Sequence, residues 1–581
     1  MRCTEIGPCA PSGCAKSERR SSSSIQRASR MQGSPYDAAM RSESLIASTP
    51  SRRATLLTVL AWATVIAAPL LPGILGSASA SAARVPVETI LLLLLSLLLP
   101  HRTLRLVVAS AFAMITVVAI AIAVLDRSFV ATIDRGFALA EDWRAVANAY
   151  RVVDGVVGPT LAALAATLVV AIVLALAVVL VWCAQRCARS LHDSGNHGRI
   201  AITTAAVTWS ALAIAGVQYP TGAAVAAADS LRSLSTTVEH ATQSARERDA
   251  FAAALRVDPL AAQASGQLLG SLRGKDVVIV FVESFGEVAL SGTGPMSSIS
   301  RTIDEYAARL SRDGYRAESA FLSSPTFGGV SWLAHSTLQS GMWVDSQQKY
   351  DTLLESDRLT ITRLFGDAGW RTVVVSPAVT EPWPEGAAFY GFDRLLDKGA
   401  LAYEGPAFGF ASVPDQFTWH RFAEEELSRT APIMAQVSLI SSHSPWTPTP
   451  QFVPWAHVGK PGPFSAQPRD SADVWPDAQR VRAAYAESIR YSLRSTLSFL
   501  ETYDPSNLVV VLVGDHQPSR IVSGETADTD VPITIVSKDS AVFEHIEQWG
   551  WDAGFRPSSD APVWRMDAFR DRFVAAFSAP E

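Results

Sequence analysis

The sequence predicts a bundle of five transmembrane helices followed by an α/β domain that has a mainly parallel sheet with helices on both faces. Three observations predict this fold class. The front half of the 581-residue chain contains long apolar stretches that carry almost no charge. The second half alternates short β-branched runs with amphipathic segments, as chains with parallel sheets do. Two of those runs end abruptly in acidic residues and histidine, which is typical of strands beside a binding site.

The membrane half begins after a polar tail. Residues 1–53 are rich in serine and arginine and lack apolar periodicity, so we expect a disordered cytoplasmic tail. Apolar stretches then predict a transmembrane domain over residues 54–220, because a spanning helix needs about 20 apolar residues. The five stretches are 54–76, 85–100, 104–125, 159–183 and 200–217.

Arginines near the helix ends predict the orientation. If every stretch spans, Arg52, Arg102 and Arg186, with the arginines that neighbour each of them, fall on the same side. Loops rich in Lys and Arg face the cytoplasm. We therefore expect a multi-pass protein of a bacterial-type cell membrane, with a cytoplasmic N-terminus and an extracellular C-terminal half.

Two connecting segments carry less information. The loop 126–158 contains Phe129, Phe137 and Trp143, and two interpretations stay open: an amphipathic helix on the membrane surface, or a cap on the bundle. Residues 221–274 are rich in alanine, serine and arginine at helical spacing, which predicts a helical linker.

Residues 275–581 are expected to form one α/β domain. The predicted strands are 277–282, 371–375, 432–439, 508–513 and 532–536. The predicted helices are 303–312, 331–339, 359–367, 418–428 and 483–502. A further amphipathic helix is expected over 564–573, either packing through Phe569 and Phe573 or contacting anionic lipid headgroups.

Charge and cysteine content exclude several functions. The formal net charge is −6 and the pI is near 6.0, without the basic surface that nucleic-acid binding needs. All five cysteines lie at or before Cys187, so the α/β domain has neither a thiol nucleophile nor a disulfide. The apolar helices carry almost no charge, which disfavours a transporter.

Metal-binding residue types stand at two predicted strand ends. Glu283 follows the first strand, and Asp515 and His516 follow a strand roughly 230 residues later. Parallel strands place their carboxyl ends at one edge of a sheet, where α/β proteins bind ligands. The three side chains therefore predict a divalent-metal site.

A hydroxyl nucleophile is predicted at the start of the helix over 331–339. Gly328 and Gly329 lead into it, and its first turn holds Ser331. Free backbone N–H groups at a helix N-terminus favour an oxyanion and a more acidic hydroxyl. His335 lies four residues later on the same face, where it can contact substrate. The alternative interpretation is a serine that only caps the helix.

Together these motifs resemble the alkaline phosphatase superfamily, and within it the membrane-bound sulfatase-like branch that includes the lipoteichoic acid synthases. The resemblance rests on their order: Glu283, a hydroxyl some fifty residues later, Ser442-His443-Ser444-Pro445-Trp446, and Gly514-Asp515-His516. Five transmembrane helices before an extracellular catalytic domain are also typical of this branch.

The resemblance implies roles for individual residues. Glu283, Asp515, His516 and the nucleophilic hydroxyl would bind one divalent ion, Mn²⁺ or Mg²⁺, with Zn²⁺ as a further candidate. Ser331 is the expected nucleophile, because Gly328 and Gly329 stand just ahead of it and after Thr326, and Thr326 is the reserve. His443 would bind substrate or act as acid and base.

The sequence also departs from the family. The Pro and Arg of the sulfatase nucleophile motif are missing after Ser331, which disfavours sulfate esters. Trp383 matches a tryptophan of the lipoteichoic acid synthases and is a candidate substrate contact, but Glu385 stands where those enzymes have the arginine that binds glycerophosphate. A second metal would need further ligands, for which Asp415 and His420 are the candidates.

These residues predict a membrane-anchored phosphotransferase that moves a phosphoglycerol-like group from a membrane lipid to an envelope polymer. A phosphodiesterase, phosphatase or sulfuric-ester hydrolase with the same site is the alternative among enzymes. A catalytically silent envelope binding or scaffold protein is the alternative of another class.

Overall fold

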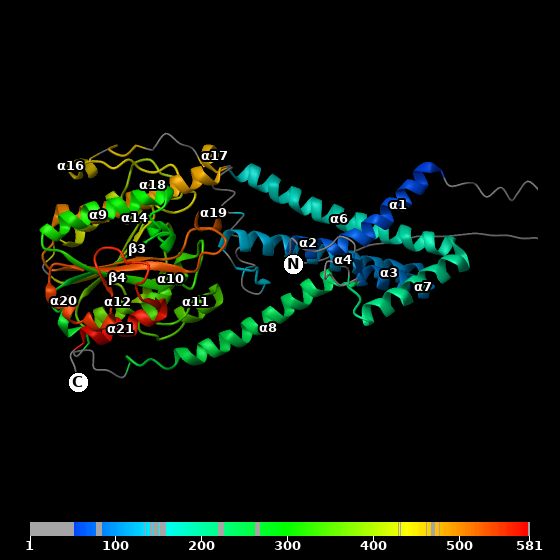
Figure 1. Ribbon diagram of the computed structural model, residues 1–581, viewed down its shortest axis with the longest axis horizontal. Helices are drawn as coiled ribbons and strands as arrows, with labels where there is room; N and C mark the ends of the chain where they lie inside the picture. Colours follow the sequence, from blue (N-terminus) through cyan, green and yellow to red (C-terminus); the bar gives the residue numbers. More distant parts are fainter. Residues whose placement is uncertain are drawn as a thin grey trace, which may run out of the picture. The chain divides into compact units, whose positions relative to one another are not determined.

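The computed structural model has α-helical elements followed by a mixed α/β domain (Figure 1). It describes residues 51–76, 84–133, 135–139, 142, 150, 158–218, 226–261, 268–427, 429, 431–460, 462–465, 471–475 and 477–578. Nearly all of the predicted tail, and about half of the loop predicted between residues 126 and 158, lie outside these residues.

Within the described residues, three apolar helical segments are long enough to span a membrane: Arg52–Gly76, Arg102–Ala131 and Pro159–Asp193. They belong to α1 (Arg52–Ala67) with α2 (Leu71–Gly76), to α4 (Arg102–Ile133) and to α6 (Pro159–Asp193). These helices support association with a membrane.

The two other predicted spans form helices that are not long or apolar enough by themselves to cross a membrane. Helix α3 (Val87–Leu98) has 12 residues, fewer than the roughly 20 that a span needs. Helix α7 (Gly195–Ile214) has 20 residues, but polar and charged side chains occupy its first turns, including Asn196, His197 and Arg199. The predicted count of five spans is therefore not confirmed. The connector that follows contains the predicted helix, α8 (Asp229–Leu255).

The α/β domain is organised around a nine-stranded sheet with the order β10-β4-β9-β8-β3-β7-β5-β6, and β11 pairs with β4. Five neighbouring strands, from β8 to β6, run parallel, and β9 is antiparallel to β8. Their bounds are β3 Asp276–Val282, β4 Arg316–Ser323, β5 Arg371–Ser376, β6 Arg394–Asp397, β7 Ile433–Leu439, β8 Leu508–Gly514, β9 Asp530–Ser537, β10 Asp552–Ala553 and β11 Val563–Arg565. The predicted, mainly parallel sheet is confirmed.

Helices cover both faces of this sheet, since β3 is buried on both sides. Val278, Val280 and Val282 join one hydrophobic core, whereas Val277, Ile279 and Phe281 join the other. The first core is covered by α9 (Ser297–Arg312), α15 (Asp415–Phe422) and α18 (Ala478–Tyr503). The second is covered by α10 (Ser331–Ser340), α12 (Ile361–Asp367) and α21 (Phe569–Phe577). Figure 1 shows α9 and α18 on one side of the strands and α12 and α21 on the other. Shorter helices are α11 Gln347–Leu354, α13 Pro384–Tyr390, α14 Lys398–Leu401, α16 Trp455–Val458, α17 Ser471–Val474, α19 Arg520–Ser523 and α20 Ser540–Glu544.

One predicted element was wrong in part. Residues 564–573 were expected to form a single helix, but Val563–Arg565 is a strand and the helix begins at Phe569. Trp564 and Met566 are buried beside β4, because this short strand extends the sheet. Phe569 and Phe573 are fully buried, so packing is the correct one of the two interpretations of this segment.

A buried ionic network joins the segment after α8 to the last helix. The Asp258 carboxylate accepts hydrogen bonds from both terminal nitrogens of Arg570, at 3.1 and 3.0 Å. The Arg570 side chain is fully buried, and Arg358 Nε lies 3.4 Å from the same carboxylate. Burial alone would raise the pKa of Asp258, but the hydrogen bonds and charge of Arg570 outweigh it and lower that pKa.

Candidate metal and nucleophile site

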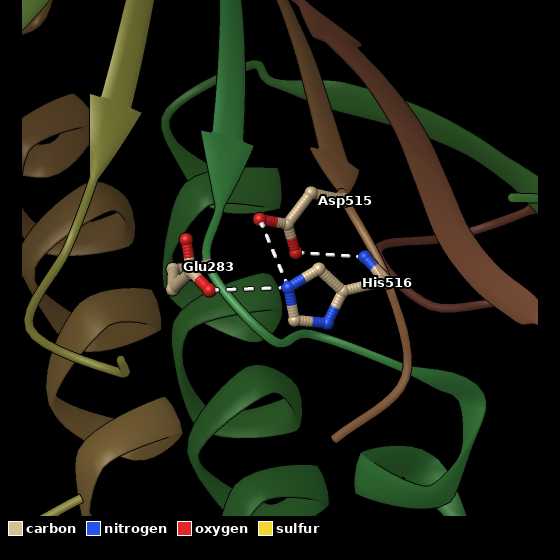
Figure 2. A group of neighbouring side chains, drawn as sticks. All are labelled: Glu283, Asp515 and His516. Carbon is tan, nitrogen blue, oxygen red and sulfur yellow. Dashed lines mark hydrogen bonds and ion pairs between the residues drawn. The ribbon is translucent and has the colours of Figure 1, made fainter. Parts of the chain in front are cut away.

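The strand register places the predicted metal ligands side by side. Val282, the last residue of β3, pairs with Gly514 of β8 on one side and with Leu439 of β7 on the other. The residue after each strand therefore emerges at the same edge of the sheet. Figure 2 shows Glu283, Asp515 and His516 converging below two neighbouring strand ends.

These three side chains form one tight, buried cluster. Their ligand atoms all lie within 4.8 Å of one another. His516 Nε2 is 3.2 Å from Glu283 Oε1 and 3.8 Å from Asp515 Oδ2. The other ring nitrogen, Nδ1, is 2.8 Å from the carbonyl of Gln517, to which it can donate. That contact leaves Nε2 free to act as a ligand.

The local backbone orients the two carboxylates. Asp515 Oδ1 accepts hydrogen bonds from the backbone N–H groups of Ser284 and His516, both at 2.7 Å. Ser284 has a φ of 58°, which turns the chain sharply just after Glu283. Ser442 Oγ donates to the carbonyl of Glu283 at 2.6 Å, and Tyr485 donates to the carbonyl of Ser284 at 2.9 Å. The strand ends are thus fixed by buried hydrogen bonds.

The electrostatics of the cluster are those of a cation site. Burial and the Glu283 carboxylate raise the pKa of Asp515, because two negative charges share a buried pocket. Burial alone would raise the pKa of Glu283 as well, but proximity to His443 and the hydrogen bond with His516 lower it. The pKa of His516 is raised despite its burial, since both carboxylates favour its charged form.

The residues present fit a divalent ion. Asp515 Oδ2 is buried and has no hydrogen-bond partner in the described part of the chain. A buried carboxylate oxygen without a donor is costly, and a cation would satisfy it. Carboxylate and imidazole ligands suit Mn²⁺, Mg²⁺ and Zn²⁺ to different degrees, so the set does not select one of them.

Ser331 lies against this cluster. Its hydroxyl donates to Glu283 Oε2 at 2.9 Å and lies 3.3 Å from His516 Nε2. The preceding residue, Val330, has a left-handed φ of 58°, which sets Ser331 at the first position of α10. The reserve candidate, Thr326, has a buried hydroxyl with no partner among the described residues. The structure therefore brings Ser331, and not Thr326, to the predicted ligands.

His443 lies on a loop after β7 and faces the same cavity as Ser331. Its Nδ1 is 2.6 Å from the carbonyl of Ser444, and its ring stacks on Phe410 with centroids 3.7 Å apart. Sequence reasoning missed Phe410, because it stands in a loop without periodicity.

Asp415 holds the loop that carries His443 and is not part of the metal cluster. Its Oδ1 accepts from the backbone N–H groups of Ile440 and Ser441, at 2.9 and 3.0 Å, and its Oδ2 accepts from Ser492 at 2.5 Å. Burial raises its pKa to about 6. The other candidate ligand for a second metal is His420. Its Nδ1 is hydrogen-bonded to the Tyr503 hydroxyl at 3.0 Å, and its Nε2 lies 3.3 Å from the Glu424 carboxylate.

We expect Asp415→Ala to destabilise this loop and impair His443. The substitution leaves two buried backbone donors unpaired, so the free energy of unfolding should fall by about 2–4 kcal/mol. Denaturant titration of the purified protein measures this change. Asp415→Asn keeps a carbonyl oxygen for the two donors and is the matched control. Equal stability of the alanine variant and the wild type would contradict the assigned role.

The hydroxyl of Ser331 opens into a cavity of about 480 Å³. His335 and Trp383, the predicted substrate contacts, both line it. His335 stacks on Phe281, with centroids 3.9 Å apart, and burial lowers its pKa to about 4. Glu385 is exposed and does not line the cavity, whereas Glu381 does. The sequence did not predict Glu381 as a cavity residue. It also did not predict the aromatic residues that line the cavity beside Trp383.

Comparisons with known proteins find one family model that matches part of this chain. Residues 275–548 match the model of the sulfatase family. A search of the curated proteins finds no match.

Several solved structures are similar. The lipoteichoic acid synthase LtaP from Listeria monocytogenes is 19% identical, over 46% of this chain and 66% of that one, with a TM-score of 0.34. The phosphoglycerol transferase GacH from Streptococcus pyogenes is 13% identical, over 50% of this chain and 73% of that one, with a TM-score of 0.33. The phosphoethanolamine transferase EptA from Neisseria meningitidis is 13% identical, over 90% of this chain and 95% of that one, with a TM-score of 0.42.

Proposed function

We propose that this chain is a membrane-anchored, metal-dependent phosphotransferase of the cell envelope, a proposal supported by the match of residues 275–548 to the sulfatase family model. Its donor would be a membrane lipid and its acceptor an envelope polymer. The observation that carries the proposal is the contact of Ser331 Oγ with Glu283 and His516, at 2.9 and 3.3 Å. A nucleophile at a metal site supports group transfer through a covalent intermediate.

In the proposed site, Glu283, Asp515, His516 and Ser331 Oγ would hold one divalent ion. Such an ion lowers the pKa of a coordinated hydroxyl and offsets the negative charge of a phosphoryl group. The orientation of these ligands comes from the chain itself, through the backbone donors to Asp515 and the fixed tautomer of His516. We propose Mn²⁺ or Mg²⁺, with Zn²⁺ as a further candidate.

The first step would form a bond between Ser331 Oγ and the phosphorus atom while the bond from phosphorus to the lipid alcohol breaks. The hydroxyl proton leaves toward Glu283 Oε2, which already accepts its hydrogen bond. His443 lines the same cavity and would protonate the departing alkoxide. In the second step, an acceptor hydroxyl gives its proton to His443 and bonds to phosphorus, while the bond from phosphorus to Ser331 Oγ breaks and Ser331 Oγ takes back the proton from Glu283.

The same constellation would support hydrolysis if water replaced the acceptor alcohol. A phosphodiesterase or phosphatase is therefore the second candidate. A sulfuric-ester hydrolase is disfavoured, because the segment after Ser331 lacks the proline and arginine of the sulfatase motif. The sulfatase match favours an enzyme over a silent scaffold.

We propose five transmembrane helices over residues 54–220, with the N-terminus in the cytoplasm and the domain of residues 275–581 outside. With only the three long helices spanning, Arg102 and Arg105 would face the outside, against the usual placement of positive charge. With α3 and α7 spanning as well, Arg52, Arg102 and Arg186, with the arginines that neighbour each of them, lie on the cytoplasmic side.

Mass spectrometry of the covalent intermediate tests the proposed chemistry. The full-length protein in detergent micelles is incubated with a membrane-lipid extract and Mn²⁺, quenched in acid and digested. We expect the mass increment of a phospho-alcohol group on the peptide that contains Ser331. An increment on Thr326, or none while the lipid is consumed, would overturn the assignment of the nucleophile. Adding an acceptor alcohol separates transfer from hydrolysis, since only a transferase yields the phosphorylated acceptor as its main product.

A further inference from the structure

The cavity beside Ser331 has an unusual distribution of charge. It is the space next to the nucleophile into which the alcohol group of the donor would extend. None of the described residues that line it is a lysine or an arginine. Its carboxylates are Glu283, which belongs to the metal cluster, and Glu381, which does not.

Glu381 stands on the loop between β5 and α13, and its side chain is exposed to the cavity and to solvent. No hydrogen bond or ion pair ties it to another residue in the described part of the chain. The two positive charges of a divalent ion balance the carboxylates of Glu283 and Asp515, whereas Glu381 lies outside the metal cluster and has no cationic residue beside it among the described lining residues.

Aromatic side chains form the walls of the cavity. Those that line it are Trp332, Tyr350, Trp383, Tyr390, Phe392 and Phe410. Trp383 packs with Tyr390 and Phe392, with ring centroids 5.6 and 6.4 Å apart. On the loop that faces His443, Phe410 is 51% exposed. Aromatic faces attract cations through the ring quadrupole, and quaternary ammonium groups are bound in this way.

We propose that Glu381 and this aromatic wall form a subsite for an ammonium group on the transferred phospho-alcohol. The inference rests on the proposed function and names its substrate class: an amino-alcohol phosphate of a zwitterionic lipid, in place of the neutral glycerol of the sequence-based expectation. The metal cluster would take the phosphate, and Glu381 would take the positive charge at the other end of the group.

A neutral polyol would find hydroxyl partners in this cavity, on Ser376, Thr380 and Ser438, but it would bring no counter-charge for Glu381. When a ligand fills the cavity, Glu381 loses part of its water, and a neutral head group returns only hydrogen bonds and no charge. Gln436, a polar lining residue, already accepts a hydrogen bond from Gln339 through its Oε1, at 2.8 Å. An ammonium group compensates the carboxylate and contacts the aromatic faces together.

Chromogenic substrates test the inference on the full-length protein in detergent micelles with Mn²⁺. The substrates are the 4-nitrophenyl esters of phosphocholine, phosphoethanolamine and phosphoglycerol, whose release of nitrophenol is followed by absorbance. We expect kcat/KM to be about 10-fold higher for the two ammonium substrates than for the phosphoglycerol ester, because the free energy of one charge-assisted contact corresponds to about this factor. Comparing the two ammonium substrates distinguishes a quaternary from a primary amine.

The variant Glu381→Gln should lower kcat/KM for the ammonium substrates about 10-fold and leave phosphoglycerol nearly unchanged. Glu385→Gln, on an exposed residue outside the cavity, is the matched control and should change nothing. Equal use of all three substrates by the wild type, or an equal effect of Glu381→Gln on all three, would overturn the subsite. Ser331→Ala distinguishes a failure of the proposed function from a failure of the subsite. Activity that survives in Ser331→Ala contradicts the proposed function. An inactive Ser331→Ala protein, together with a wild type that shows no preference for the ammonium substrates, contradicts the subsite alone.

Discussion

Replacing Ser331 with alanine is expected to abolish turnover. This hydroxyl is the one group of the chain that we propose to bond to phosphorus, and removal of a catalytic nucleophile costs roughly 10⁴- to 10⁶-fold in kcat. Release of the alcohol from a phospholipid, or of nitrophenol from a chromogenic phosphodiester, measures the loss. The folded state should be almost unaffected, since Ser331 is half-buried and, among the described residues, its hydroxyl has polar contacts with Glu283 and His516 alone.

Two matched variants make this prediction specific. Ser331→Thr keeps a hydroxyl at the same position and should retain part of the activity. Thr326→Ala removes the other candidate hydroxyl and should leave kcat within about 3-fold of the wild type, because Thr326 makes no hydrogen bond to the metal cluster through its side chain. An active Ser331→Ala protein with an inactive Thr326→Ala protein would reverse the assignment.

Removal of the metal is expected to have the second largest effect. Dialysis of the full-length protein against a chelator should lower activity at least about 100-fold, and adding back Mn²⁺ or Mg²⁺ should restore it. Binding should also stabilise the fold by about 2.7 kcal/mol at an ion concentration 100 times the dissociation constant. Elemental analysis should find one ion per chain, and thermal unfolding should shift to higher temperature with the ion.

The ligand variants give readouts that do not depend on activity. In Glu283→Ala and His516→Ala, both the bound ion and the thermal shift should be lost, because the cluster keeps too few ligands to hold a divalent ion. His457→Ala, on an exposed histidine of α16, is the control and should bind and shift like the wild type. Unchanged metal content in Glu283→Ala and His516→Ala would contradict the proposed site.

The sheet was predictable where strands are buried on both faces. Runs such as those of β3 and β8 are continuous and apolar because parallel central strands contact helices on each side. β4 was missed because its sequence, RAESAFLS, mixes charged and small residues and reads as neither strand nor helix. It lies toward the antiparallel side of the sheet, between β9 and β10, where pairing and not composition defines it.

The metal cluster was predictable for a related reason. Glu283 and the Asp515-His516 pair each follow a recognisable strand directly, so the parallel register alone brings them together. Ser331 could be predicted from the two glycines that stand just ahead of it. The walls of the cavity were not, since Glu381 and Phe410 reach it from loops whose paths depend on tertiary packing.

The network of Asp258 with Arg570 and Arg358 has a practical consequence for making a truncated protein. A fragment that starts at residue 275 would remove Asp258, the partner of both terminal nitrogens of the fully buried Arg570, and would leave only Nε paired, with Asp571. Breaking a buried ion pair costs about 3–5 kcal/mol. The same cut removes Phe251 and Leu255 of α8, which share a hydrophobic cluster with Leu333. Leu333 is two residues from Ser331 on α10. The smallest fragment that folds and turns over should therefore begin upstream of α8, near residue 226, although the predicted sheet begins some fifty residues later.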